Sequence, residues 1–514
     1  MARELVMEML RIRAGVLATA AALLLLCAPA TAAWGQDPLA GLDETIREMM
    51  QDWSVPGVGI AIVQSDDVTY ARGFGVKRIG GSDPVDENTI FAIGSSSKAF
   101  TAAAIAMLVD EEKLSWDDRV VDRLPTFQLS DPYITRNIRI RDLMSHNTGL
   151  LRGDRIWYAS GLTRAAILDR VRHQPVTFPL RSTFQYNNTT WIAAGEVIKA
   201  VSGMTWDDFV AARIFRPLGM ARSTTLIGPL ARLDNVAEPH IETPDGELTA
   251  VPYRDIDNAG PAGSINSSVM QVAQWVRMQL AGGEYEGERL ISEAAVAEMH
   301  TAQMFLRAEG LWSAVFPESD FLLYGLGWFL TDYRDIKMVS HGGNIDGMTA
   351  LVVMVPERDY GWVILTNLNG ANGFTSALAH HLVDRLEGGE QLPWNEMMKE
   401  TFAELEEQAR AQARQVEESR LEGTSPTLPL AEYVGTYESD MYGEFVVTEE
   451  RGVLRATFGA GFEGTLEHWH YDTFRSTWTD PVNQHEFLRF EIGTDGKVAV
   501  LHAEIEGSVA FTRR

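Results

Sequence analysis

The hydrophobic and polar positions of the first 390 residues predict a sheet combined with helices. Apolar residues at consecutive or alternate positions indicate a β-hairpin over 58–76 and three or four further strands over 324–367. The apolar run 99–109 predicts a buried helix, and the run 374–386 predicts a last helix that packs on the sheet. We expect an antiparallel sheet of five or more strands beside an all-helical region.

A different pattern begins after residue 390. The charged run 396–422 has one apolar edge, which predicts a linker helix, and prolines at 426 and 429 end it. Short strands of alternating pattern are expected at 444–448, 453–458, 486–490 and 498–502. We therefore predict three parts after the leader, at 37–390, 391–428 and 429–514.

Residues 1–32 have the pattern of a secretory signal peptide. Arginines at 3, 11 and 13 precede an apolar core over 14–29, and Ala30-Thr31-Ala32 offers small residues for cleavage. The core is short for a membrane-spanning helix, so we expect no stable span after processing and a periplasmic or secreted location. Cys27 is the one cysteine. Its acylation, as in a lipoprotein, is disfavoured because Leu26 precedes it where lipidation sites prefer a small residue.

Charge and missing motifs exclude several classes of function. The net charge is −27, from 44 basic and 71 acidic residues, so phosphate backbones and anionic lipids should repel the chain. We expect a small-molecule or peptide substrate and no nucleic-acid partner, and we leave homo-oligomerisation open. The sequence has no His-Glu-x-x-His, no Gly-x-x-x-x-Gly-Lys-Ser/Thr and no Gly-x-Ser-x-Gly. We accordingly expect no metal, no cofactor and no α/β-hydrolase nucleophile.

Ser95 and Lys98 are the first candidates for chemistry. Residues three apart on a helix face the same way, and the helix predicted at 99–109 places Ser95 near its N-terminus. A lysine can take the serine proton only if burial or a neighbouring cation lowers its pKa from about 10.4. The alternative is structural, with Ser95 as a helix cap and Lys98 as a solvated side chain.

Two further motifs lie downstream. Tyr186-Asn187-Asn188 directly precedes an expected helix at 191–201, and His341-Gly342-Gly343 ends a short β-like run before 348–355. With the Ser-x-x-Lys motif, this order resembles the superfamily of serine β-lactamases, D-alanyl-D-alanine carboxypeptidases, D-aminopeptidases and class C-like esterases. The resemblance covers about residues 42–386 and includes the runs 143–150, 216–220, 261–264 and 324–328.

The resemblance implies an α+β fold of the β-lactamase/transpeptidase type, with the site in a groove between the sheet and the helical region. The segment 430–437 and the strands after it resemble the lipocalin-like antiparallel β-barrel appended to some members. Four roles stay open for the barrel: binding part of the substrate, covering the site, mediating oligomerisation or stabilising the protein.

The resemblance also implies residue roles. Ser95 would attack a carbonyl and form an acyl-enzyme, while Lys98 and Tyr186 take its proton and deliver it to the leaving group. Asn188 would hold the substrate's acyl-amide oxygen and help to position the lysine. The backbone N–H groups of Ser95 and Asn344 would form the oxyanion hole. Structural roles remain the alternative for Tyr186 as a half-buried aromatic, for Asn188 as a cap or turn residue, and for His341 as a strand histidine whose ring nitrogens are satisfied within the fold.

His341 departs from the lysine that many penicillin-recognising members carry. A histidine is mostly neutral at pH 7, so it should hold a substrate carboxylate more weakly than lysine would. We therefore favour amide and ester substrates over β-lactams, and we expect a pH dependence near neutrality that His341→Lys flattens. Gly342 and Gly343 would let their strand approach the substrate closely.

Three functions follow from this reading. The first is a secreted serine hydrolase acting through an acyl-enzyme on amides, peptides that include D-amino acids, or esters. The second is a penicillin-binding sensor or weak β-lactamase that acylates and turns over poorly, and the third is a non-catalytic binding protein, which the intact motifs disfavour. Loops at 152–161 and 304–320 are expected to shape the pocket, but their sequences do not specify the acyl group, leaving group or stereochemistry.

Overall fold

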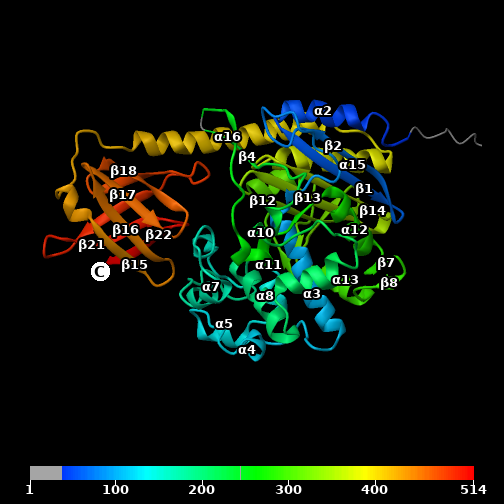
Figure 1. Cartoon of the computed structure of the whole chain (residues 1–514), viewed down its shortest axis with the longest axis horizontal. Coiled ribbons are helices and arrows are strands. Elements are labelled where there is room, and N and C mark those ends of the chain that lie inside the picture. The colour runs from blue at the N-terminus through cyan, green and yellow to red at the C-terminus, as the bar shows by residue number, and fades with distance from the viewer. Residues whose placement is uncertain (1–36, 244) are drawn as a thin grey trace, which may run out of the picture.

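An eight-stranded antiparallel sheet forms the centre of the N-terminal region (Figure 1). The computed structural model describes residues 37–243 and 245–514, so the predicted signal peptide lies outside the described residues. The strands are β1 (Gly57–Gln64), β2 (Asp67–Gly75), β9 (Met304–Phe305), β10 (Leu323–Tyr324), β11 (Phe329–Tyr333), β12 (Ile336–Ile345), β13 (Met348–Val355) and β14 (Tyr360–Thr366). Their order is β2-β1-β14-β13-β12-β11-β10-β9, so the first hairpin pairs with the last strand.

Helices cover both faces of this sheet and form a helical region beside it. The longer ones are α2 (Leu42–Asp52), α3 (Ser97–Asp110), α7 (Arg164–Val171), α8 (Thr189–Ser202), α12 (Val269–Leu280), α13 (Glu293–Met299), α15 (Asn372–Glu387) and α16 (Trp394–Glu418). The shorter ones are α4 (Val120–Arg123), α5 (Pro132–Asn137), α6 (Ile140–Leu143), α9 (Trp206–Val210), α10 (Ile227–Leu230), α11 (Gly260–Gly263) and α14 (Leu311–Val315). In residues 37–243 and 245–514, none of the helices combines the length and the apolar character needed to cross a bilayer.

Two hydrophobic cores hold the sheet. Strands β1 and β14 are buried almost throughout, because their apolar side chains contact helices on both faces of the sheet. One core packs α2 and α15 against the sheet around Ile60 and Trp362. The other contains α3, which is buried all round, together with α8 and α12, and it continues into the C-terminal part.

The C-terminal part is a closed barrel that follows the long helix α16 (Figure 1). Its strands are β15 (Gly435–Ser439), β16 (Gly443–Glu450), β17 (Val453–Phe458), β18 (Phe462–His470), β19 (Thr473–Trp478), β20 (Phe487–Ile492), β21 (Val498–Glu504) and β22 (Ser508–Arg513). Aromatic rings pack against one another inside it, with Phe445 in contact with Phe458 and Phe511, and Tyr433 in contact with Phe474. Side chains therefore fill the interior.

The expected α+β fold and C-terminal antiparallel barrel are confirmed. The four barrel strands predicted from the sequence are present, and four more close the barrel, namely β15, β18, β19 and β22. These four strands carry many Thr, Glu and Arg residues, so their hydrophobic pattern is weak in the sequence although they pair in the barrel. We propose boundaries near residues 390 and 428 for the three parts, because α16 begins at Trp394 and β15 at Gly435.

Candidate active site

Ser95 lies in a single turn of 3₁₀-helix, Gly94–Ser96, which leads directly into α3. Two neighbouring hydroxyl groups fasten this turn. Ser96 Oγ donates to the carbonyl oxygen of His341 on β12 at 2.9 Å, and Ser97 Oγ accepts from the backbone N–H of Ile265 at 3.1 Å. Because α3 is buried all round, the turn is held between the helical region and the sheet.

Lys98 is fully buried, with 0% of its surface exposed. Its Nζ lies 3.1 Å from Ser95 Oγ and donates to Asn188 Oδ1 and to the carbonyl oxygen of Ala262, each at 2.8 Å. Burial holds the pKa of Lys98 well below its ordinary value, because the charged ammonium loses hydration. The alternative in which Lys98 is a solvated side chain is therefore wrong. A neutral amine beside an alcohol is what general-base activation needs.

Tyr186 lies just before α8 and is half-buried. Its ring stacks on His146, with centroids 4.2 Å apart, and Lys98 Nζ lies 4.9 Å from its centroid. Burial raises the pKa of Tyr186 to about 12, while its hydrogen bond with Ser95 acts in the opposite direction. The phenol therefore keeps its proton at neutral pH and contacts the same hydroxyl as the lysine.

Asn188 connects Lys98 to a charged loop. Its Oδ1 accepts from Lys98, and its Nδ2 donates to Asp154 Oδ1 at 2.9 Å. Asp154 also pairs with Arg152, with 2.5 Å between Nε and Oδ2, and the Arg152 guanidinium lies 5.3 Å from the centre of the Tyr186 ring. The amide therefore has a fixed orientation, with its oxygen toward the amine and its nitrogen toward the carboxylate.

His341 is buried on β12, on the other side of Ser95. Its Nδ1 lies 2.6 Å from the carbonyl oxygen of Gly342, and its Nε2 lies 3.0 Å from Tyr324 Oη. Since a carbonyl only accepts, Nδ1 carries the proton and Nε2 accepts from the phenol. Burial lowers the pKa of His341 to about 3, and Lys98 adds to the shift. This low pKa argues against the expectation that His341 titrates near neutrality.

Strand β12 passes directly beside the turn that carries Ser95. A Cβ on Gly343 would lie 1.9 Å from the carbonyl oxygen of Ile93 and 2.9 Å from the backbone nitrogen of Ser95. Gly94 has φ +50°, and a Cβ there would lie 2.8 Å from the backbone nitrogen of Asn344. Only glycine permits this approach. Gly342 is different, because the nearest atom to a Cβ there is 3.6 Å away, an ordinary contact.

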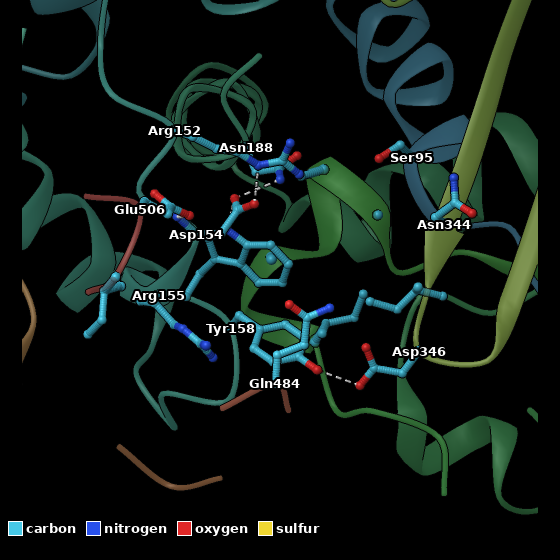
Figure 2. Close-up of a pocket in the computed structure, with 18 of the residues that line it drawn as sticks. Ser95, Arg152, Asp154, Arg155, Tyr158, Asn188, Asn344, Asp346, Gln484 and Glu506 are labelled. Carbon is cyan, nitrogen blue, oxygen red and sulfur yellow. Dashed lines mark hydrogen bonds and ion pairs between the residues drawn. The ribbon is translucent and has the colours of Figure 1, made fainter. Parts of the chain in front are cut away.

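A polar cavity of about 480 Å³ opens beside Ser95, between the N-terminal region and the barrel (Figure 2). The loop Arg152–Tyr158 lines one side, as expected for a loop that shapes the pocket, and Asn344 and Asp346 line the other. The barrel residues that line it are Gln484, His485, Glu486, Glu504, Ile505 and Glu506. Tyr158 lies between Arg155 and Asp346 in Figure 2 and donates to Asp346 Oδ2 at 2.7 Å.

An apolar cavity of about 270 Å³ also opens at Ser95. It lies over β12 and β13, against α14 and α15, and the segment 311–316 forms one wall. Trp312, Phe316 and Phe329 contact one another there, with ring centroids 4.9 to 6.4 Å apart. Ser95 therefore lies between a charged cavity and an apolar one.

The structure brings all eight predicted site residues together: Ser95, Lys98, Tyr186, Asn188, His341, Gly342, Gly343 and Asn344. The side chain of Asn344 bonds to Thr349 and Asn372, so its backbone remains the candidate group. Sequence reasoning placed Arg152 and Asp154 in a loop expected to shape the pocket and Tyr324 in a family-like run, but it gave none of them a role at the site. It missed the barrel glutamates altogether.

The described part of the chain holds no group of side chains that could bind a metal ion. Residues 37–243 and 245–514 contain no group of three His, Cys, Asp or Glu side chains placed to hold an ion.

An antiparallel sheet with a helical region beside it, and a Ser-x-x-Lys turn at their junction, defines the class of serine β-lactamases and penicillin-binding proteins. The chain belongs to the beta-lactamase family, whose model matches residues 42–387. A second model, described as a domain of unknown function (DUF3471), matches residues 419–513, which include all the barrel strands.

The relatives include hydrolases and penicillin-binding proteins. Unguisins hydrolase ungD of Aspergillus violaceofuscus is 28% identical over 486 residues, which are 86% of this chain and 83% of that protein. Penicillin-binding protein 4 of Amycolatopsis lactamdurans is 28% identical over 356 residues, which are 67% of this chain and 89% of that protein.

Two solved structures share the fold. The octameric penicillin-binding protein homologue from Pyrococcus abyssi covers 92% of this chain and all of its own, with TM-score 0.62 and 23% identity. D-amino acid amidase from Ochrobactrum anthropi SV3, complexed with L-phenylalanine, covers 68% of this chain and 99% of its own, with TM-score 0.56 and 19% identity. The first similarity extends over nearly the whole chain.

Proposed function

We propose that this protein is a serine hydrolase that forms an acyl-enzyme on Ser95 with amide, peptide or ester substrates. The observation that carries the proposal is the buried amine of Lys98, 3.1 Å from Ser95 Oγ and held by neutral oxygen acceptors. Its lowered pKa leaves the amine neutral and able to accept a proton.

The proposed reaction has two halves. Ser95 Oγ attacks the substrate carbonyl carbon while its proton passes to Lys98 Nζ. The leaving amine or alcohol then takes a proton from the Lys98 and Tyr186 pair, and the acyl group stays on Oγ as an ester. In the second half water loses a proton to the same pair and attacks the ester carbonyl. The bond from the carbonyl carbon to Ser95 Oγ then breaks, the pair returns that proton to Oγ, and the acid leaves. Each half returns the pair to its starting protonation.

The oxyanion hole is assigned to the backbone N–H groups of Ser95 and Asn344. Support comes from the close approach of β12 to the serine turn, because a Cβ on Gly343 would lie 2.9 Å from the Ser95 nitrogen. Fixed N–H donors stabilise the negative oxygen of the tetrahedral intermediate without reorganising. Asn188 remains the candidate that positions the acyl-amide oxygen.

The substrate class follows from the walls of the site. The neutral imidazole of His341 offers no cation to a carboxylate, which supports neutral amides and esters over penicillins. The apolar cavity beside Ser95 supports a large apolar group on one side of the scissile bond, and the charged cavity a polar group on the other. The D-amino acid amidase that shares the fold agrees with amide substrates derived from D-amino acids, and the unguisins hydrolase agrees with a hydrolytic reaction.

A second candidate is a penicillin-binding or sensor-like protein, or a weak β-lactamase, that acylates and turns over slowly. The similarity to penicillin-binding protein 4, which extends over 67% of this chain, favours this second candidate. Both candidates use Ser95, so they differ only in the rate of deacylation. We place the protein in the periplasm or outside the cell on the leader pattern of residues 1–32.

One substrate panel tests both candidates. The panel contains D- and L-aminoacyl p-nitroanilides, short-chain p-nitrophenyl esters and a cephalosporin, each measured with the wild type and Ser95→Ala. Steady turnover lost in Ser95→Ala supports the hydrolase, whereas a stoichiometric burst with no further turnover supports the sensor. Activity that survives in Ser95→Ala would contradict both.

A further inference from the structure

We propose that Glu506 of the barrel is a positioning residue for this site, because it holds the loop that orients Asp154, Asn188 and Lys98. The inference rests on the proposed function. It also assigns the barrel a role at the active site, although the barrel interior is filled by its own aromatic side chains.

Glu506 occupies the turn between β21 and β22, and its side chain lies beside Asp154 (Figure 2). Its Oε2 accepts from the backbone N–H of Gly153 at 2.5 Å, and its Oε1 accepts from the N–H of Asp154 at 2.9 Å. A carboxylate that accepts two successive N–H groups makes two charge-assisted hydrogen bonds. Both backbone groups belong to the loop that lines the polar cavity.

The backbone conformation of Glu506 supports a specific role for its side chain. The residue has φ +50°, a left-handed conformation that costs a non-glycine residue energy, and Gly507 follows with φ +105°. Gly or Asn would fit such a turn with less strain. Neither has a side chain long enough to make the same pair of contacts, so the glutamate is explained by what it binds.

A continuous chain of hydrogen bonds leads from this loop to the amine. Asp154 Oδ1 accepts from Asn188 Nδ2 at 2.9 Å, and Asn188 Oδ1 accepts from Lys98 Nζ at 2.8 Å. The two ends of an amide differ, since one only donates and the other only accepts. If Asp154 moves away, the amide nitrogen of Asn188 loses this acceptor, and of these two bonds only the one from Lys98 Nζ still orients the amide. Glu506 thus acts through Asp154 and Asn188.

A second barrel carboxylate holds the same loop. Glu486 Oε1 accepts from Arg155 Nη2 at 2.5 Å, and the two side chains are only 7% and 18% exposed. The Arg155 guanidinium also lies 3.9 Å from the ring centre of Phe462, another barrel residue. The segment 153–155 is therefore fastened to the barrel at both ends.

The test is a double-mutant cycle in the full-length chain. Acylation of Ser95 is measured as the burst with a p-nitrophenyl ester in Glu506→Ala, in Asp154→Ala and in the double variant. We expect each single change to slow the burst about tenfold or more, because small misplacements of catalytic groups are costly. We expect the double variant to fall within about twofold of Asp154→Ala alone, since the two residues act on one path.

Two further variants separate positioning from folding. Glu506→Gln keeps one acceptor oxygen, so its burst rate should lie between those of the wild type and Glu506→Ala. Glu491→Gln removes another barrel carboxylate, which bonds to His502 on the surface, and should leave the burst unchanged. Burst rates are compared only among variants that keep a cooperative thermal unfolding transition. If Glu506→Ala does not fold, Glu506→Gln replaces it in the cycle.

Two results would overturn the inference. One is a folded Glu506→Ala with a burst within twofold of the wild type, and the other is a double variant whose loss equals the product of the two single losses. Failure of the proposed function is a separate result, because it appears as activity that Ser95→Ala retains.

Discussion

Arg152 and Asp154 form an ion pair, with 2.5 Å between Nε and Oδ2, and they shift the pKa of Lys98 in opposite directions. The carboxylate stabilises the ammonium form of the lysine and the guanidinium destabilises it. The burial of Lys98 is the larger effect, and the ion pair adjusts it. The loop 152–154 therefore adjusts the range of pH over which the amine is neutral, a range that burial mainly determines.

The first prediction concerns this pair. Asp154→Asn should lower the pKa of Lys98 further and move the acid limb of kcat/KM to lower pH, because the neutral amine then persists at lower pH. Arg152→Gln should move the same limb to higher pH. Activity is measured from pH 4 to 10 with a neutral ester, whose own charge does not change.

Other groups that face Lys98 do not obscure this comparison. Burial lowers the pKa of His146 and of His341, so both stay neutral, and burial raises the pKa of Tyr186 to about 12. Limbs that move in the same direction in both variants would contradict the assignment of opposite charge effects.

The second prediction concerns stability and Lys98. The fold holds this lysine neutral, whereas the unfolded chain protonates it below pH about 10.4. Unfolding therefore takes up a proton, and raising the pH makes unfolding less favourable. Relative to Lys98→Met, the wild type should gain up to about 1.4 kcal/mol of unfolding free energy per pH unit between pH 8 and 10. Urea unfolding at each pH measures the difference, and a difference independent of pH would mean a charged lysine in the fold.

The third prediction concerns His341. Because its pKa lies at about 3, it should leave no limb near pH 6.5 in the profile of kcat/KM. His341→Gln keeps a neutral hydrogen-bonding side chain and should retain the shape of the wild-type profile. A limb near neutrality that disappears in this variant would restore the expectation made from the sequence. His341→Lys should increase kcat/KM for a carboxylate-bearing substrate about tenfold relative to a neutral ester.

The fourth prediction compares two neighbouring glycines. Gly343→Ala should lower activity at least about a hundredfold, because its Cβ would lie 1.9 Å from the Ile93 carbonyl oxygen and must push β12 away from Ser95. It should also lower the melting temperature. Gly342→Ala meets only an ordinary contact at 3.6 Å and should keep the wild-type melting temperature. Equal melting temperatures for the two variants would show that the strand adapts to the added methyl group.

The fifth prediction concerns the apolar cavity. Trp312→Ala removes part of its wall and should lower kcat/KM for esters with a phenyl group roughly tenfold, with a smaller effect on acetate esters. Phe305→Ala is the matched control, because Phe305 precedes α14 and is 61% exposed. A loss of the same size for both ester classes would mean that the cavity does not contact the substrate.

The local part of the site follows from the sequence. Spacing on one helix turn brings Ser95 and Lys98 together, and the strand and helix patterns place Tyr186, Asn188 and His341 at the ends or middle of regular elements. These relations depend on residues that are close together in the sequence. Hydrophobic periodicity and short motifs therefore predict them directly. Strands of the sheet and four strands of the barrel follow for the same reason. The barrel itself was implied by the family resemblance, and four of its strands with weak hydrophobic patterns were not predicted.

The charge states and the barrel contacts depended on residues far apart in the chain. Lys98 and His341 are neutral because distant helices and strands bury them, and a motif does not state how deeply a side chain lies. Glu506 reaches Asp154 across about 350 positions of sequence, in a turn with no distinguishing pattern. Desolvation and long-range hydrogen bonds exist only after the chain has packed, so the tertiary structure alone decided them.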